Sequence, residues 1–211
     1  MAKLASIGSI LTISCLLLFT QDVYARKQVP VAEKENLFLR DIFLGKEKIV
    51  KIHLYVQDLR VGHPNATVFE VATSSITNTS PYSFGSIHVL DDLITEEPDI
   101  NSRPLGRVQG LTTNADLSTF GIHLNLNFYF TVGKLAGSTL SILGRNQILD
   151  DQREFPVVGG SGIFRFTRGY AIQTSYPMDP AVANYGVLEY TIYATYDSKL
   201  GESDVVEIAQ M

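Results

Sequence analysis

Asp58 is the residue of this sequence whose type and position most directly suggest chemistry. It ends a run of alternating residues, Lys48 to Asp58, and shares a face with the apolar members of that run. Those apolar residues are Val50, Ile52, Leu54 and Val56. A carboxyl group at the end of such a face loses solvent, which raises its pKa and lets it exchange a proton or bind a phenol near neutral pH. The alternative is a structural carboxylate that accepts hydrogen bonds from turn amides, and the residues alone leave both open.

Two arginines could supply a complementary positive group. Arg107 and Arg153 each lie in or beside an apolar run, and an inward guanidinium would bind a phenolate or carbonyl oxygen or stack on an aromatic ring. The competing interpretation is an ion pair, for instance with Asp91, Asp92 or Glu154, and the residues by themselves favour it.

The familiar signatures of enzyme sites are weak in this chain. Gly159-Gly160-Ser161-Gly162 is superficially like a phosphate-binding or nucleophile turn, but it leads into another strand and not a helix, so we expect a tight β-turn. The histidines lie in different runs, without the spacing of metal ligands. They are His53, His63, His88 and His123. We therefore expect neither a metal site nor a phosphate-binding loop.

The elements that would position these side chains have a period of two, which is typical of strands. From Phe120 to Val132, apolar and polar residues alternate without interruption. Further runs extend over Lys48–Asp58, Thr67–Thr73, Ser86–Asp91, Leu105–Leu111, Ser138–Leu143, Ile163–Thr174 and Gly186–Tyr196. No amphipathic helix of normal length intervenes, which favours antiparallel hairpins. We expect an all-β fold, an eight-stranded antiparallel β-barrel in a single domain, because closure removes exposed edges; a two-sheet sandwich is the alternative.

The start of the chain has the pattern of a secretion signal. Lys3 precedes a mostly apolar stretch, and the small residues around Val23-Tyr24-Ala25 predict cleavage after Ala25. The stretch is short for a membrane span, which needs about 20 apolar residues. The only cysteine, Cys15, lies in this leader. We expect a soluble, secreted protein with a signal peptide (1–25), an N-terminal arm (26–47), a barrel (48–196) and an acidic C-terminal tail (197–211).

Charge and sequons add to the prediction of export. The net charge of −5 argues against a phosphate-binding surface and therefore against nucleic acid as a partner. Two glycosylation sequons, at Asn65 and Asn78, lie in turn-rich stretches.

Several ordered motifs together resemble the plant dirigent family, from about Lys48 to Tyr196. The motifs are Leu54-Tyr55-Val56-Gln57-Asp58, Phe84-Gly85-Ser86, Asp91-Asp92, Gly106-Arg107-Val108-Gln109-Gly110, Ser138-Thr139-Leu140-Ser141 and the stretch from Val157 to Ala171. The resemblance implies an eight-stranded barrel, a homo-oligomer (dimer or trimer), an apoplastic location and no cofactor. It also implies that Asp58 is the family's strand-end carboxylate and Arg153 its pocket arginine.

The resemblance further implies a division of labour. Proteins of this family do not oxidise their substrates; a separate oxidase or laccase generates phenoxy radicals from monolignols such as coniferyl alcohol. The barrel then orients the radicals so that coupling yields one stereoisomer of a lignan, which is catalysis by orientation. We take this as the leading hypothesis for function.

Two departures from the family pattern keep other hypotheses open. Asn146 stands where lignan-forming members have an aspartate, and Thr112 stands where they have a tyrosine. Gly144-Arg145-Asn146 is closer to the pterocarpan synthases, lyases that dehydrate an isoflavanol-like substrate; Asp58 and Arg153 would then help the hydroxyl to leave. A binding module for aromatic metabolites is the third hypothesis. We expect Arg107, Thr112 and Asn146 to contact the substrate.

Overall fold

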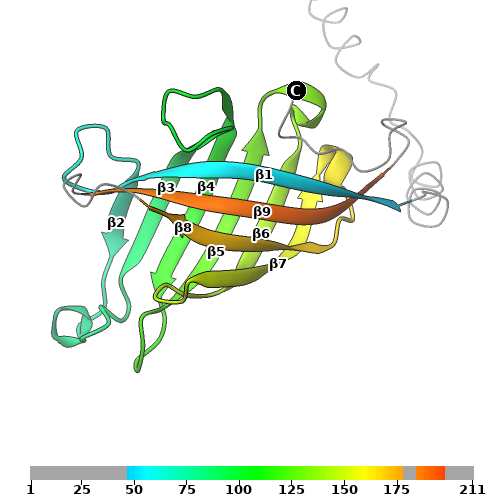
Figure 1. Ribbon diagram of the computed structural model, residues 1–211. Helices are drawn as coiled ribbons and strands as arrows, with labels where there is room; N and C mark the ends of the chain where they lie inside the picture. The colour runs from blue at the N-terminus through cyan, green and yellow to red at the C-terminus, as the bar shows by residue number, and fades with distance from the viewer. Residues whose placement is uncertain (1–46, 178–183, 198–211) are drawn as a thin grey trace, which may run out of the picture. The chain divides into compact units, whose positions relative to one another are not determined.

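Strands dominate the part of the chain that the structure, a computed structural model, describes, namely residues 47–177 and 184–197. Nine strands and three short 3-10 helices occur in these residues (Figure 1). They are β1 (Glu47–Leu59), β2 (Val68–Ala72), η1 (Thr77–Thr79), β3 (Ile87–Thr95), β4 (Pro104–Asn114), β5 (Gly121–Phe130), η2 (Gly133–Leu135), β6 (Thr139–Gln147), β7 (Gln152–Ser161), η3 (Gly162–Phe164), β8 (Gly169–Tyr176) and β9 (Tyr185–Asp197). The predicted leader, the arm up to residue 46 and the tail after Asp197 lie outside the described residues.

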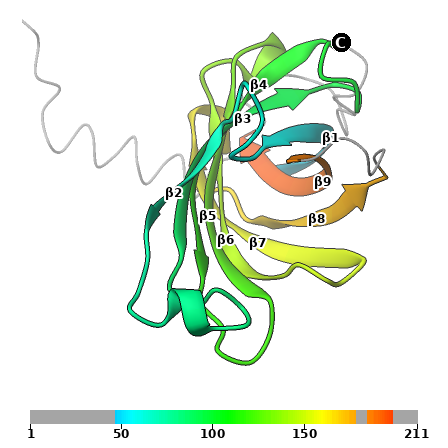
Figure 2. The same cartoon turned by 90° about the vertical axis from the view of Figure 1, so that its left-hand side faces the viewer.

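The strands close into an antiparallel ring. Neighbours follow the order β1-β9-β8-β7-β6-β5-β4-β3, and β3 pairs back with β1 (Figure 2). This closing seam has three residue pairs, Tyr55 with Thr95, Val56 with Ile94, and Gln57 with Leu93. The predicted eight-stranded antiparallel barrel is therefore confirmed, and the sandwich is not formed.

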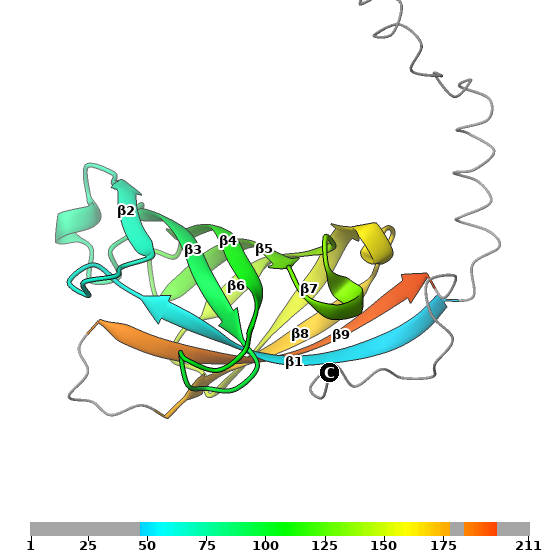
Figure 3. The same cartoon turned by 90° about the horizontal axis from the view of Figure 1, so that it is seen from above.

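The membership of the ring differs from the predicted runs. β2 corresponds to one of the eight predicted strands, but among the described strands it pairs with β3 only and lies outside the ring as a ninth strand (Figure 3). β7 takes its place, although Pro156 and the paired Gly159 and Gly160 obscure its alternation in the sequence. The expected tight turn begins only at Gly162, where φ is +65° and an added Cβ would lie 2.4 Å from Ser138 Oγ.

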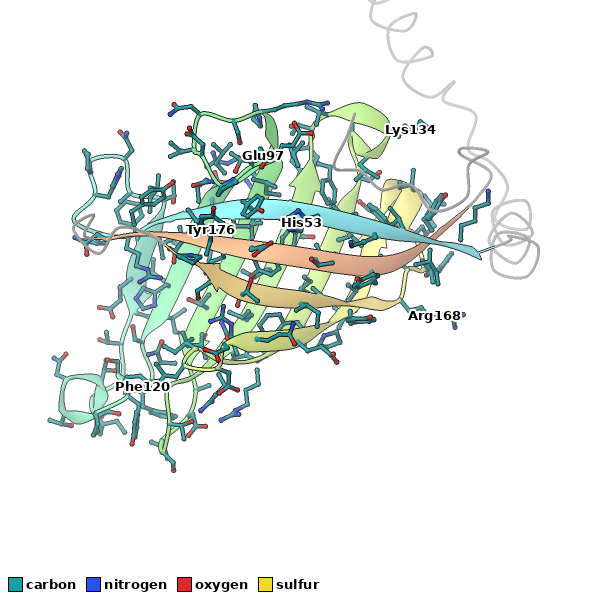
Figure 4. All side chains as sticks on the ribbon, viewed as in Figure 1. His53, Glu97, Phe120, Lys134, Arg168 and Tyr176 are labelled. Atoms are coloured by element: carbon teal, nitrogen blue, oxygen red, sulfur yellow. The ribbon has the colours of Figure 1, made fainter. Side chains whose placement is uncertain are left out.

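Alternation separates the two faces of the wall. Along β5, Leu124, Leu126, Phe128 and Phe130 are buried, while the residues between them are exposed. On the outer face of β1, His53 Nε2 lies 2.7 Å from Glu189 Oε1 of β9, and Figure 4 labels His53 on this side. Among the described residues, no helix is long and apolar enough to cross a membrane.

One end of the interior is filled by aromatic rings. Phe128 and Tyr190 meet edge to face with ring centroids 5.2 Å apart, and Phe130 lies 6.0 Å from Phe164. Phe128 and Phe164 are fully buried, as is Phe155. Each such ring contributes roughly 1.5–3 kcal/mol of burial free energy. This packed end stabilises the closed ring of strands. The interior beyond it is hollow.

Candidate functional site

The hollow part of the barrel is a cavity of about 740 Å³, to which all nine strands contribute side chains. Its size is typical of a site for a small organic molecule. Apolar lining is given by Val56, Val61, Val68, Leu90, Val108, Ile122, Leu124, Leu126, Ile148 and Leu188. The polar lining is Asp58, Arg60, Glu70, His88, Asp92, Thr112, Asn114, Asn146, Arg153, Gln173, Ser175 and Tyr190. A lining that combines apolar walls with many polar groups suits an aromatic molecule that carries hydroxyls.

Asp58 lies in this cavity, as its alternation predicts. Its Oδ2 accepts hydrogen bonds from Arg60 Nε at 2.9 Å and from Arg60 Nη2 at 2.6 Å. The Asp58 carboxylate is largely buried, whereas the Arg60 side chain is mostly exposed to solvent. The charge of Asp58 raises the pKa of Arg60. The ion pair fixes the negative charge of Asp58 at the edge of the cavity.

Asp92 is a second carboxyl group in the cavity, and sequence reasoning did not single it out. It is only 3 % exposed, and Thr67 Oγ1 donates a hydrogen bond to its Oδ1 at 2.5 Å. Burial raises its pKa to about 7; the hydrogen bond from Thr67 opposes the rise, and the nearby charge of Asp58 adds to it. The seam ends at Gln57 with Leu93, so one further step along both strands reaches Asp58 and Asp92. Near neutral pH, Asp92 can therefore give or take a proton.

Arg153 approaches the cavity from β7. Its Nη1 donates to the carbonyl oxygen of Ile148 at 3.2 Å, and its Nη2 donates to Ser175 Oγ at 3.0 Å, while its Nε has no partner. Burial lowers the pKa of this guanidinium. Within the described part of the chain Arg153 pairs with no carboxylate, so the alternative of an ion pair with Glu154 is not realised. A buried cation with a free donor favours a ligand oxygen.

Asn146 lies on the neighbouring strand, β6. Its Nδ2 donates to Gln173 Oε1 at a long 3.5 Å, and Gln173 Nε2 donates to the hydroxyl of Tyr190 at 2.5 Å. In the ladder between β7 and β8, Gln173 lies directly opposite Arg153. The Oδ1 of Asn146 is buried without a partner. A ligand hydroxyl could accept from Arg153 Nε and donate to Asn146 Oδ1, which neither an ether nor a phenolate can do.

The other two residues expected to contact the substrate, Thr112 and Arg107, lie on different faces of the wall. Thr112 lines the cavity, and its contact with a substrate stays a prediction. Arg107 does not line the cavity: its Nε donates to Asp91 Oδ1 at 2.9 Å, and its guanidinium also donates to the Asp91 carbonyl oxygen, so the ion-pair alternative is correct. The cause is a break in alternation, since the register shifts around Leu105 and both Leu105 and Val108 are buried. Arg107 therefore belongs to the outer face.

The sequons are accessible in the fold. Asn65 is exposed between β1 and β2, and Asn78 is exposed within η1. Glycosylation at either asparagine stays a prediction.

The missed residues carry a readable signal. Asp92 shares its face of β3 with Leu90 and Ile94, by the same alternation that identifies Asp58. Gln173 and Tyr190 lie among apolar inward residues of β8 and β9, where a lone polar group marks a lining position.

Comparison with known proteins places this cavity in a family context. A family model described as dirigent-like protein matches residues 49–195. Dirigent protein 11 of Arabidopsis thaliana is 40% identical over 147 residues, covering 70% of this chain and 74% of that protein. Pterocarpan synthase 1 of Glycyrrhiza echinata is 34% identical over 150 residues, covering 70% and 78%. A solved structure of a pterocarpan synthase dirigent protein superposes with a TM-score of 0.64 at 34% identity, covering 72% of this chain and 89% of the other.

Proposed function

The chain belongs to the dirigent family, and from this premise we propose that it binds an isoflavanol-like phenol in the barrel cavity and removes water from it stereoselectively. The observation that carries the proposal is Asp92, a buried carboxyl group whose pKa is raised to about 7. Such a group is protonated in a useful fraction of molecules near neutral pH and can act as a general acid. The similarity to pterocarpan synthases supports the same reaction class.

The reaction needs a proton donor and no oxidant. Asp92 gives its proton to the benzylic hydroxyl, the carbon–oxygen bond breaks, and water leaves. The conjugated phenol releases its proton to solvent, and its oxygen becomes the carbonyl of a quinone methide. Asp92 takes a proton back from solvent. A second hydroxyl of the same molecule then adds to the quinone methide carbon and returns its proton to the carbonyl oxygen. The net change is the loss of one water.

The remaining polar groups hold the substrate and support the acid. Arg153 Nε and Asn146 Oδ1, both without a protein partner, bind the phenolic hydroxyl, and Arg153 stabilises the oxygen as it gains negative charge. Asp58, fixed by Arg60, contributes the neighbouring charge that helps to keep Asp92 protonated. The apolar wall then determines which face of the quinone methide is open to attack.

The test is turnover of an isoflavanol in the absence of any oxidant. Wild-type protein should release a single enantiomer of the cyclised product, and Asp92→Asn should lower the rate by about 10²- to 10⁴-fold, as removal of a general acid does. Asp91→Asn is the matched control, because Asp91 is adjacent but lies on the outer face with Arg107. Full activity of Asp92→Asn would remove the carboxyl group from the mechanism.

Stereochemical control of radical coupling is the second candidate. The volume of the cavity, about 740 Å³, favours it, because it is more than one phenolic ring requires. In this case a separate oxidase or laccase makes phenoxy radicals, and the protein only orients them. Coniferyl alcohol with a one-electron oxidant should then give an enantiomeric excess that disappears without the protein. If neither assay responds, binding without turnover is the surviving hypothesis.

We also propose export to the apoplast with glycans at Asn65 and Asn78, on the sequence pattern and on the exposure of both asparagines. Expression in plant cells, followed by detection in the wall fluid and glycosidase treatment, tests both points. Retention inside the cell, or an unchanged mobility after glycosidase treatment, would contradict them.

A further inference from the structure

The cavity continues past Asp92 to a polar rim that the proposed reaction does not use. Three residues form this rim: Glu70 of β2, His88 of β3 and Thr112 of β4, all of which line the cavity. Glu70 pairs with His88 across β2 and β3, and His88 pairs with Thr112 across β3 and β4, so the three side chains lie in one row on the same face. The rim depends on β2, the strand outside the closed ring, which extends the wall beyond β3 (Figure 3).

Two members of this row have unused hydrogen-bonding capacity. Glu70 Oε2 accepts a hydrogen bond from Ser86 Oγ at 2.5 Å. In the described ranges, neither the imidazole of His88 nor the hydroxyl of Thr112 makes a side-chain hydrogen bond, and both side chains are half-buried. Half-buried polar groups that face a cavity and lack partners are suited to bind a ligand group.

The position of the rim sets the size of the ligand. His88 and Asp92 lie four residues apart on the same face of β3, which corresponds to about 13 Å along the strand. A ligand whose reacting carbon is at Asp92 needs a second ring to reach His88. The ligand group that meets His88 and Thr112 is a hydroxyl, because a hydroxyl can donate to an imidazole nitrogen and accept from Thr112. The carboxylate of Glu70 disfavours an anion at this place.

We propose that His88, with Thr112 beside it, is a specificity-determining residue that binds a hydroxyl on the far ring of a two-ring phenolic substrate. This inference rests on the proposed function for the near ring only, namely that a phenol occupies the Arg153 end of the cavity. It narrows the substrate class to phenols with a hydroxyl at both ends.

The experiment compares two bibenzyls, one with a para hydroxyl on both rings and one with a para hydroxyl on one ring only. Calorimetric titration of wild-type protein should show about three- to tenfold tighter binding of the double phenol, the contribution of one hydrogen bond. His88→Leu should abolish this preference and leave the affinity for the single phenol unchanged. His88→Gln, which keeps an acceptor, should retain part of the preference.

The control is His123→Leu, because His123 is an exposed histidine on β5 that does not line the cavity. It should preserve the preference. Equal affinity of the two bibenzyls for wild type, or an unchanged preference in His88→Leu, would overturn the role of His88 while leaving the Arg153 end intact. Failure of both bibenzyls to bind wild type would instead refute phenol binding in the cavity, and with it the proposed function.

Discussion

Replacing Asp92 by Asn tests the central electrostatic feature of the cavity through stability as well as activity. The Asp92 carboxyl group has a pKa of about 7 in the fold, against 3.8 as its ordinary value. Between pH 3.8 and about pH 7, the Asp92 carboxyl group keeps its proton in the folded protein but has released it in the unfolded chain. The contribution of Asp92 to the free energy of unfolding is therefore greatest below about pH 4, falls as the pH rises through this window, and is lowest above about pH 7.

The size of this effect follows from the two pKa values. Their difference corresponds to about 4 kcal/mol of stability lost between acidic and alkaline pH. Asn has no proton to lose, and its Oδ1 can still accept the hydrogen bond from Thr67. Asn does not titrate, so a hydrogen bond from Thr67 that is weaker by about 1 kcal/mol lowers the stability of the variant at every pH. We expect Asp92→Asn to be less stable than wild type by about 1 kcal/mol near pH 4 and more stable by about 3 kcal/mol at pH 8. The same change should remove activity, so the residue opposes stability to serve function.

Urea unfolding followed by far-ultraviolet circular dichroism at a series of pH values measures the effect, since the chain contains no Trp to serve as a fluorescent probe. Asp91→Asn, on the outer face, should show no gain at pH 8. A difference between Asp92→Asn and wild type that does not change with pH would refute the argument. So would a variant that is less stable than wild type at pH 8, because the carboxylate would then be well accommodated in the fold.

Four further outcomes follow from the structure. Asp58→Ala should lower the pKa of Asp92, because a neighbouring negative charge is lost, and should move the alkaline limb of the pH–rate profile to lower pH. Arg153→Leu should weaken binding of a phenol by about tenfold to a hundredfold in calorimetry, yet leave the midpoint of urea unfolding unchanged or higher, because it removes a buried cation. Arg107→Ala should change the free energy of unfolding by no more than about 1 kcal/mol and leave phenol binding unaltered, since its ion pair with Asp91 is exposed. Phe128→Ala should cost about 3–5 kcal/mol in the same unfolding assay, because the ring is fully buried at the packed end.

The sequence predicts this fold well wherever alternation is unbroken. β5 keeps strict alternation from His123 to Phe130. On β1 both faces are buried from Leu54 to Leu59, yet the alternation of its sequence correctly predicts that Asp58 points into the cavity. Arg107 shows the limit: Leu105 and Arg107 are two residues apart and should share a face, but the bulge at Leu105 reverses the alternation. Glycines at 106 and 110 have no side chains that would reveal this reversal in the sequence.

The candidate site depends on contacts between strands that are distant in sequence. The raised pKa of Asp92 results from burial and from the charge of Asp58, against the opposing hydrogen bond from Thr67, and these groups come from different parts of the chain. The free Nε of Arg153 and the free Oδ1 of Asn146 are equally invisible in the sequence, because only the folded wall shows which polar atoms remain without partners. Alternation can identify inward residues, but it does not show whether the interior is packed or hollow.

The pairing of β1 with β9 also determines when the barrel can fold during synthesis. Within residues 47–177 and 184–197, the longest ladder joins the first strand, β1, to the last, β9, through thirteen residue pairs. Until β9 has been synthesised, β1 lacks its main partner and β8 has an open edge. Such long-range pairing makes folding slow and leaves unpaired edges that invite aggregation. Chains truncated before Tyr185 should therefore aggregate, and the cavity can form only once synthesis of the domain is complete.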